Sequence, residues 1–341
     1  MMRGILKLAI VLVLSQWVWA CGTGWPAPEP PVGARVWPEP PEPPRIRYVR
    51  SLSGPHDFGI VKPWYRRMAE TLFGKTEEYL IRPTGVTERD GVLYIADPGA
   101  QALWIFDIPQ QRFTKITQID KTALASPVAV AARNDGAVFV ADSWLKKIFL
   151  IDREGKLLRV FIDGGLERPA ALAYDAATGR LYVADSAAHR IDVYGPDGAR
   201  VSAWGKRGGG NGEFNYPTHL ALAGSGTLLV TDALNFRIQA FDRDGKFLWK
   251  MGRQGDGSGN LAAPKGVAAD SQGHFYIVDA LFDAVQIFER NGSLLLAFGE
   301  RGTGRGQFWI PGGIFIGPTD RIYIADAYNQ RIQIFDFLGG R

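Results

Sequence analysis

The sequence is poor in the residues that build disulfide frameworks and zinc sites. Its 341 residues include one cysteine, Cys21, and four histidines. A lone cysteine excludes an internal disulfide framework. The histidines are His56, His189, His219 and His274, and their scatter does not bring three of them to one point, as a three-histidine zinc site requires. We therefore expect no metal and no other cofactor.

The chain also lacks a large excess of charge of either sign. The 39 Lys and Arg residues stand against 35 Asp and Glu residues, and the basic residues are spread among the acids instead of forming a stripe. Binding to nucleic acid depends on clustered positive charge that contacts phosphates. Nucleic acid is therefore not an expected partner.

Long apolar runs are absent as well. The apolar stretch LAIVLVL, residues 8–14, is shorter than the roughly 20 residues of a membrane-spanning helix. It follows the basic Arg3 and Lys7 and precedes Ala20. This order is typical of an export signal, and we expect residues 1–20 to be a signal peptide.

The end of that segment resembles the signal of bacterial lipoproteins. The tetrapeptide VWAC, residues 18–21, is similar to the box in which the cysteine becomes the first residue and carries lipid. The resemblance implies lipidation of Cys21 and attachment to a membrane of the bacterial cell envelope. By the same resemblance, an Asp after the cysteine would keep the protein from the outer membrane of a Gram-negative cell. Gly22 stands at this position, which favours the outer membrane. The alternative is an ordinary secretory signal followed by an incidental cysteine.

Proline dominates the segment that follows. Nine of residues 26–44 are proline, a composition that favours an extended polyproline II conformation and behaves as a semi-rigid spacer. We expect residues 21–44 to be a lipidated, proline-rich tether.

A sixteen-residue pattern then occurs six times along the chain. The last copy, RIYIADAYNQRIQIFD at 321–336, has counterparts at 92–107, 137–152, 180–195, 227–242 and 274–289. The sixth position of every copy is an aspartate, at intervals of 43 to 47 residues: Asp97, Asp142, Asp185, Asp232, Asp279 and Asp326. A proline begins each repeat 14 to 16 residues earlier: Pro83, Pro127, Pro169, Pro217, Pro264 and Pro311. Such a period indicates a solenoid, a propeller or an array.

One repeat predicts four short strands. Residues 264–299 contain alternating runs at 266–269, 275–278, 284–288 and 293–298. Compact glycine-containing turns such as Arg290-Asn291-Gly292 separate them, as hairpin loops do. No helical period appears inside the repeat. The sequence therefore predicts an all-β protein, a six-bladed β-propeller with four antiparallel strands in each blade.

The repeats resemble the NHL family. Copies four and six match its pattern best, through Asn235, Arg237 and Ile238 and through Asn329, Arg331 and Ile332. The resemblance covers residues 83–341. It implies the propeller fold, but the family's functions range over enzymes, RNA binders and protein-interaction platforms, so the fold alone does not choose among them.

The last repeat ends without a fourth strand, and residues 45–54, RIRYVRSLSG, resemble the fourth strands of other repeats. We expect this segment to complete blade six, which also removes an exposed sheet edge. Residues 55–82 are then an insertion. Within it, 62–74 predicts a helix, since Pro63 suits a first turn and Gly74 suits the residue after the last turn.

One face of the propeller, which we call the top face, gathers the residues after each repeated aspartate and the loops that enter each blade. Large aromatic residues are concentrated in these segments, which favours a binding surface; the alternative is packing between blades. They are Trp144, Phe214, Tyr216, Phe236, Phe282, Phe308, Trp309 and Tyr328. Trp144, Phe236, Phe282, Trp309 and Tyr328 are the candidate binding residues.

The repeated aspartates are expected to hold loops instead of a metal, because a residue present in every blade serves the blade. No catalytic residue is predicted. Asymmetric polar residues that could give the channel mouth chemistry are few: Thr84, Thr218, His219 and Lys265. The sequence thus favours a binding or scaffolding module whose partner is an envelope protein or a small ligand. The alternatives are a metal-dependent hydrolase or lyase that acts at the top of the channel and a receptor for carbohydrate or another small ligand.

Overall fold

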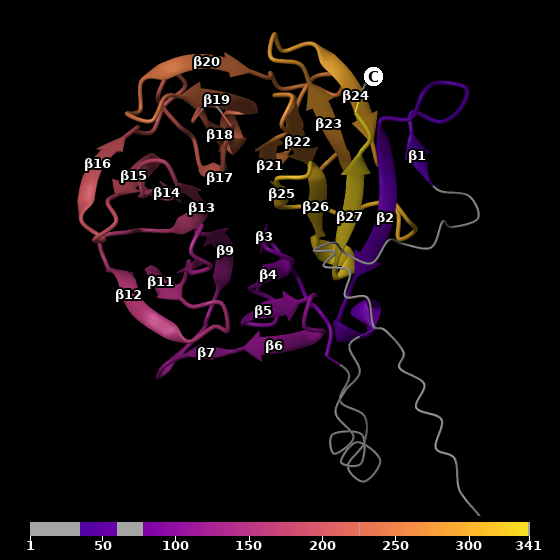
Figure 1. Ribbon diagram of the computed structural model, residues 1–341. Helices are drawn as coiled ribbons and strands as arrows, with labels where there is room; N and C mark the ends of the chain where they lie inside the picture. The colour runs from indigo at the N-terminus through magenta and orange to yellow at the C-terminus, as the bar shows by residue number, and fades with distance from the viewer. Residues whose placement is uncertain (1–34, 60–77, 225, 340–341) are drawn as a thin grey trace, which may run out of the picture.

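The computed structural model describes residues 35–59, 78–224 and 226–339 of the chain. The predicted fold is confirmed: the chain is all-β, and six blades of antiparallel strands surround a central axis (Figure 1).

Blades one to three contain β3 (Gly85–Arg89), β4 (Val92–Asp97), β5 (Ala102–Asp107) and β6 (Arg112–Ile116); β9 (Pro127–Ala132), β10 (Val138–Asp142), β11 (Lys147–Ile151) and β12 (Leu157–Asp163); and β13 (Pro169–Asp175), β14 (Arg180–Asp185), β15 (Arg190–Tyr194) and β16 (Arg200–Trp204). Blades four to six contain β17 (Pro217–Leu222), β18 (Leu228–Asp232), β19 (Arg237–Phe241) and β20 (Phe247–Met251); β21 (Pro264–Ala269), β22 (Phe275–Asp279), β23 (Ala284–Phe288) and β24 (Leu294–Phe298); and β25 (Ile314–Ile316), β26 (Arg321–Asp326), β27 (Arg331–Phe337) and β2 (Ile46–Leu52). A small hairpin of β7 (Gln118–Ile119) and β8 (Thr122–Ala123) lies between blades one and two, and single turns of 3-10 helix follow β2, β18 and β26: η1 (Pro55–Phe58), η2 (Ala233–Asn235) and η3 (Ala327–Asn329).

Burial follows the position of each strand in its blade. The middle strands, such as β22 with the sequence FYIVD, are buried on both faces because neighbouring blades cover them. The outer strand β20, FLWKM, alternates between half-buried and exposed residues. The inner strands β3, β9, β13, β17, β21 and β25 face the axis (Figure 1). The sequence pattern therefore places the core between blades and leaves the axis open.

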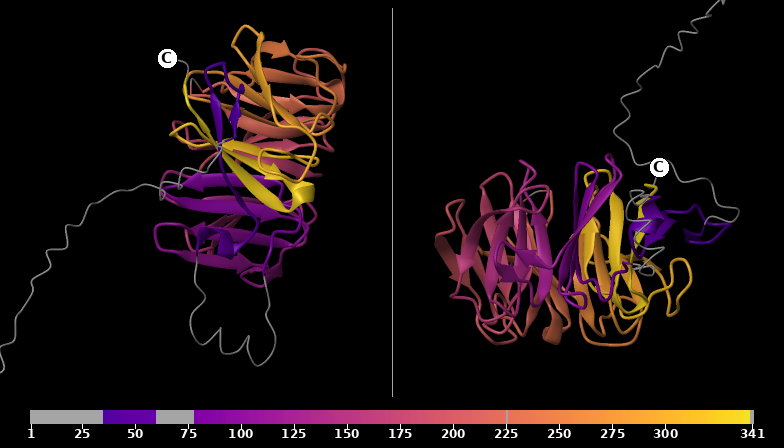
Figure 2. Two further views of the ribbon diagram at one scale, coloured as in Figure 1. Left: turned by 90° about the vertical axis from the view of Figure 1, so that its right-hand side faces the viewer. Right: turned by 90° about the horizontal axis from the view of Figure 1, so that it is seen from below.

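Blade six is closed by both ends of the chain, as predicted. The strand β2 pairs antiparallel with β27, from Ile46 opposite Phe337 to Leu52 opposite Ile332. The indigo β2 lies against the yellow β27 in both views (Figures 1 and 2). The completed blade packs against blade one in a buried cluster that includes Leu52, Ile332, Leu93 and Trp104.

The structure adds a fifth strand to this blade from residues expected to be tether. β1 (Val36–Trp37) pairs with β2. The Trp37 ring is buried, with ring centroids 5.6 Å from Phe298 and 5.9 Å from Phe335. Arg35 contacts Glu300 at 2.6 Å. Residues 35–37 thus belong to the propeller, because the side chain of Trp37, although it lies in a proline-rich segment, packs into an apolar site on the blade.

The remaining terminal predictions fall mostly outside the described residues. These include Cys21 and the signal peptide, most of the tether, and the helix predicted at 62–74. The described ends of the insertion are fixed to blade six and blade one: the Leu80 N–H donates to the Ser53 carbonyl over 2.8 Å, and Leu80 itself is buried.

The repeated aspartates fasten the top loops, as predicted. All six side chains are fully buried. Asp142 accepts the backbone N–H groups of Ala125, Ser126, Trp144 and Leu145 over 2.8 to 3.1 Å. Each carboxylate thereby satisfies loop donors that burial would otherwise leave without partners. The aspartates stabilise the blades and are not available as ligands for a metal.

Candidate binding site at the mouth of the central channel

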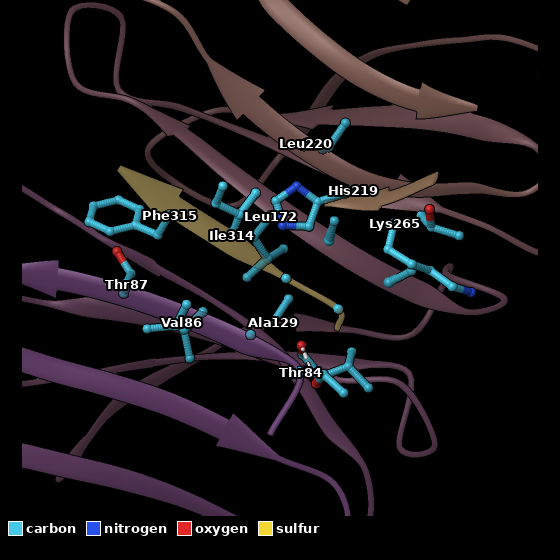
Figure 3. A pocket seen from close by; sticks show the side chains of 18 of the residues that line it. Thr84, Val86, Thr87, Ala129, Leu172, His219, Leu220, Lys265, Ile314 and Phe315 are labelled. Atoms are coloured by element: carbon cyan, nitrogen blue, oxygen red, sulfur yellow. Dashed lines mark hydrogen bonds between the residues drawn. The ribbon is translucent and has the colours of Figure 1, made fainter. Parts of the chain in front are cut away.

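The six inner strands surround a channel of about 720 Å³. Its middle is apolar, with Val86, Leu172, Leu220 and Ile314 among the lining residues (Figure 3). A volume of this size lies in the range of small-molecule pockets, which are commonly apolar with a few polar groups. The channel is therefore large enough to hold a ligand of small to moderate size.

The four predicted mouth residues all line this channel. Thr84, Thr218, His219 and Lys265 come from blades one, four and five, and Figure 3 shows Thr84, His219 and Lys265 around one space. The Thr84 hydroxyl donates to the Val128 carbonyl over 3.0 Å, so it links blade one to blade two. The Thr218 hydroxyl oxygen is buried and has no hydrogen-bond partner within the described part of the chain.

His219 is the titratable group deepest among them. Its Nδ1 accepts the backbone N–H of Val267 over 3.2 Å. Burial in the channel wall lowers the pKa of His219 to about 4, against the smaller opposing effect of that hydrogen bond. The ring is therefore neutral at pH 7, and because Nδ1 accepts, the proton resides on Nε2. His219 offers a hydrogen-bond donor and no charge.

Two cations at the mouth were missed by the sequence interpretation. Arg82 and Arg168 also line the channel and are exposed. Their backbone N–H groups donate to Asp97 and Asp185 over 2.9 and 2.7 Å. Each residue immediately precedes the proline that begins its repeat, Pro83 or Pro169. Because the inner strands all start at the mouth, this position in the sequence could have predicted that both residues lie there.

The aromatic candidates divide into exposed and packed side chains. Trp144, Tyr328 and Trp309 are 78, 47 and 40% exposed, and the rings of Trp309 and Tyr328 lie 5.8 Å apart. Phe236 and Phe282 are half-buried. Phe214 and Phe308 are fully buried and pack between strands, so the binding-surface interpretation is wrong for these two. Of the exposed aromatic residues, Tyr328 lines the channel and Trp309 lies beside it, whereas Trp144, in the turn after β10, does not line the channel.

Most of the large apolar side chains that remain exposed lie on the top face. Of the fourteen such side chains among the described residues, nine belong to its loops: Tyr79, Ile81, Trp144, Tyr216, Leu234, Leu281, Trp309, Ile310 and Tyr328. The outer strands β12, β16 and β20 carry most of the others, which are dispersed. Exposed apolar side chains concentrated on one face are characteristic of binding sites.

Two negative observations apply to the described ranges 35–59, 78–224 and 226–339. No three His, Cys, Asp or Glu side chains in them are grouped as ligands of a metal ion. None of the helices in these ranges has the length and apolar character needed to cross a membrane.

The closed ring of blades defines the class of the protein: it is a six-bladed β-propeller. The family model for the NHL repeat matches residues 308–335, which include β26 and most of β27. The chain therefore contains one segment that matches the NHL repeat, within a six-bladed β-propeller. No curated protein sequence matches it.

Solved structures similar to this chain are propellers of varied function. Virginiamycin B lyase from Staphylococcus aureus aligns with a TM-score of 0.56 and 15% identity, over 76% of this chain and 96% of that one. An auxiliary nutrient binding protein from Bacteroides thetaiotaomicron has a TM-score of 0.58 and 12% identity, over 75% and 68%. A chain of the nidogen/laminin complex has a TM-score of 0.55 and 20% identity, over 73% and 88%. At these identities the likeness shows the fold alone.

Proposed function

We propose that this protein is a binding protein of the bacterial cell envelope, attached to the membrane through lipid on Cys21. Its propeller takes a protein partner or a small ligand at the mouth of the channel. The observation that carries the proposal is the set of exposed aromatic side chains in the top-face loops, Trp144, Trp309 and Tyr328, of which Tyr328 lines the channel itself. The order of signal, proline-rich segment and propeller supports the envelope location.

The structure offers a physical reason for binding on this face. Interfaces concentrate their binding energy in a few aromatic or arginine anchors. Burial of an exposed tryptophan side chain against a partner removes apolar surface from water and therefore makes the free energy of binding more favourable. The opposite face, in contrast, consists of short turns such as the one at Asn291 and carries few large apolar side chains.

The test is capture of envelope components by the immobilised full-length protein and by top-face variants. Trp144→Ala and Tyr328→Ala should reduce capture about tenfold or more, as loss of an aromatic anchor does, while leaving the melting temperature unchanged. Asn291→Ser, on the opposite face, is the control and should capture normally. Loss of capture in the control with normal capture by both aromatic variants would contradict the proposal.

A catalytic role at the same mouth is the second candidate. The observation that favours it is His219, a neutral imidazole inside the channel, on a strand next to the one that carries Lys265. Metal analysis of the purified protein separates the two candidates. Stoichiometric bound metal, together with turnover that His219→Ala abolishes, would establish a hydrolase or lyase.

A further inference from the structure

The mouth of the channel carries three cations on alternate blades. Arg82 belongs to blade one, Arg168 to blade three and Lys265 to blade five, and all three line the same cavity and are exposed. Alternate blades of a six-bladed ring lie about a third of a turn apart. The three residues are therefore spaced around the axis.

These cations have no neutralising partner at the mouth. In the described ranges, no ion pair or side-chain hydrogen bond joins Arg82, Arg168 or Lys265 to a carboxylate. Among the described residues, Glu88 is the only acidic side chain that lines the channel. It lies four residues beyond Thr84 on an extended strand, about 13 Å away, and its Oε1 accepts the Gly91 N–H over 2.7 Å.

The backbone beneath the cations is fixed. Asp97 and Asp185 accept the N–H groups of Arg82 and Arg168, and Asp279 accepts the N–H of Ala263, two residues before Lys265, over 3.0 Å. The charges thus originate from rigid points, and the side chains alone adjust. Rigid placement lowers the entropy lost when an anion is bound.

We propose that the mouth binds a phosphate monoester that carries an apolar group. The three cations contact the three terminal phosphate oxygens, since guanidinium and ammonium groups both bind phosphate through charge-assisted hydrogen bonds. The apolar group enters the channel between Val86, Leu172 and Ile314, where the Nε2–H of His219 is an uncharged donor. This inference rests on the proposed function, because it names the chemistry of the ligand for the same mouth.

The experiment is isothermal titration calorimetry of the full-length protein at low salt with matched probes. Phenyl phosphate should bind with one-to-one stoichiometry, and inorganic phosphate, which lacks the apolar group, should bind about tenfold more weakly. Phenyl β-glucoside, which lacks the charge, should not bind detectably. Raising the salt to 0.5 M should weaken phenyl phosphate binding, because exposed charges are screened. Absence of phenyl phosphate binding, or equal binding of the glucoside, would overturn the proposal.

Single-charge variants locate the site. Arg82→Gln, Arg168→Gln and Lys265→Gln should each weaken phenyl phosphate binding about tenfold with an unchanged melting temperature, since all three side chains are exposed. Arg301→Gln is the matched control. Arg301 is exposed on the top face but does not line the channel, and its loss should leave binding within about twofold. Equal effects from all four variants would show a diffuse charge effect and overturn the site.

A vesicle assay distinguishes the source of the phosphate. Sedimentation with vesicles containing phosphatidic acid, reduced by Arg82→Gln, would assign a lipid headgroup, whereas binding of phenyl phosphate alone would assign a soluble ester. Failure of this inference can also be distinguished from failure of the proposed function. If phenyl phosphate does not bind but Trp144→Ala still loses capture, the ligand chemistry is wrong and the binding function stands.

Discussion

Arg237 makes a buried ion pair with Asp232, in which its Nε donates to the carboxylate over 2.7 Å. The other guanidinium nitrogens donate to the carbonyls of Gly209, Gly210 and Glu213. One side chain therefore connects the repeated aspartate to the loop that enters the same blade. Arg331 and Asp326 repeat the arrangement in blade six, again at 2.7 Å. The Oε1 of Gln239 also accepts the Gly212 N–H over 3.0 Å, so side chains of the blade hold the glycine-rich loop.

Arg237→Ala should destabilise the protein by about 3 kcal/mol, because it leaves a fully buried carboxylate without its cation. Urea unfolding monitored by tryptophan fluorescence measures this loss. Arg301→Ala removes an exposed arginine from another top loop and is expected to change stability by less than about 0.5 kcal/mol. Similar losses in both variants would mean that the buried pair has no special role in holding the blade.

Closure of blade six gives a second prediction. Deleting residues 46–52 removes β2 with its pairing to β27 and should cost about 5 kcal/mol or more, because the ladder and the buried Ile46 and Leu52 are lost together. Trp37→Ala should cost about 2 kcal/mol through the packing it removes. Deleting residues 22–34 should leave the melting temperature unchanged. The closure model fails if the deletions of 46–52 and 22–34 melt at the same temperature.

His219 makes stability depend on pH. Because its pKa is lowered from 6.5 to about 4 in the folded protein, the unfolded chain binds more protons between these values. The free energy of unfolding therefore has its full value above pH 6.5 and decreases as the pH drops toward 4. The expected contribution is about 1 to 3 kcal/mol, reduced from the full value because the ring borders the open channel.

Denaturant unfolding at pH 7 and at pH 4.5 tests this dependence. His219→Gln retains a hydrogen-bond acceptor for the Val267 N–H but does not titrate, so the variant should lose less stability than the wild type over this interval. His56→Gln, at a largely exposed ring, serves as the control. A wild-type pH dependence that His219→Gln leaves unaltered would rule out His219 as its source.

Lipidation gives the last prediction. Cys21→Ser should leave the precursor unprocessed or release the protein into the soluble fraction, because the residue that carries the lipid is gone. Fractionation and mass spectrometry of the mature N-terminus measure both outcomes. Membrane association that persists in the variant, with an unlipidated N-terminus in the wild type, would refute lipidation of Cys21.

The sequence by itself determined the blades. A strand is a local structure with a two-residue period, and the turn residues between strands act locally as well, so residues 264–299 predicted β21 to β24 almost to the residue. The repeat of the aspartates and prolines fixed the number of blades. The missing fourth strand after Phe337 indicated that residues 45–54 must supply it.

Only the tertiary structure decided which top-face residues are exposed. Phe308 and Trp309 are adjacent in the sequence, yet Phe308 is fully buried and Trp309 is 40% exposed, because a neighbouring blade covers one side of the loop. The same is true of the mouth. Arg82, Arg168 and Lys265 are 86 and 97 residues apart along the chain, and only closure of the ring brings them to one cavity. Contacts between blades depend on the geometry of the whole ring, which no local pattern contains.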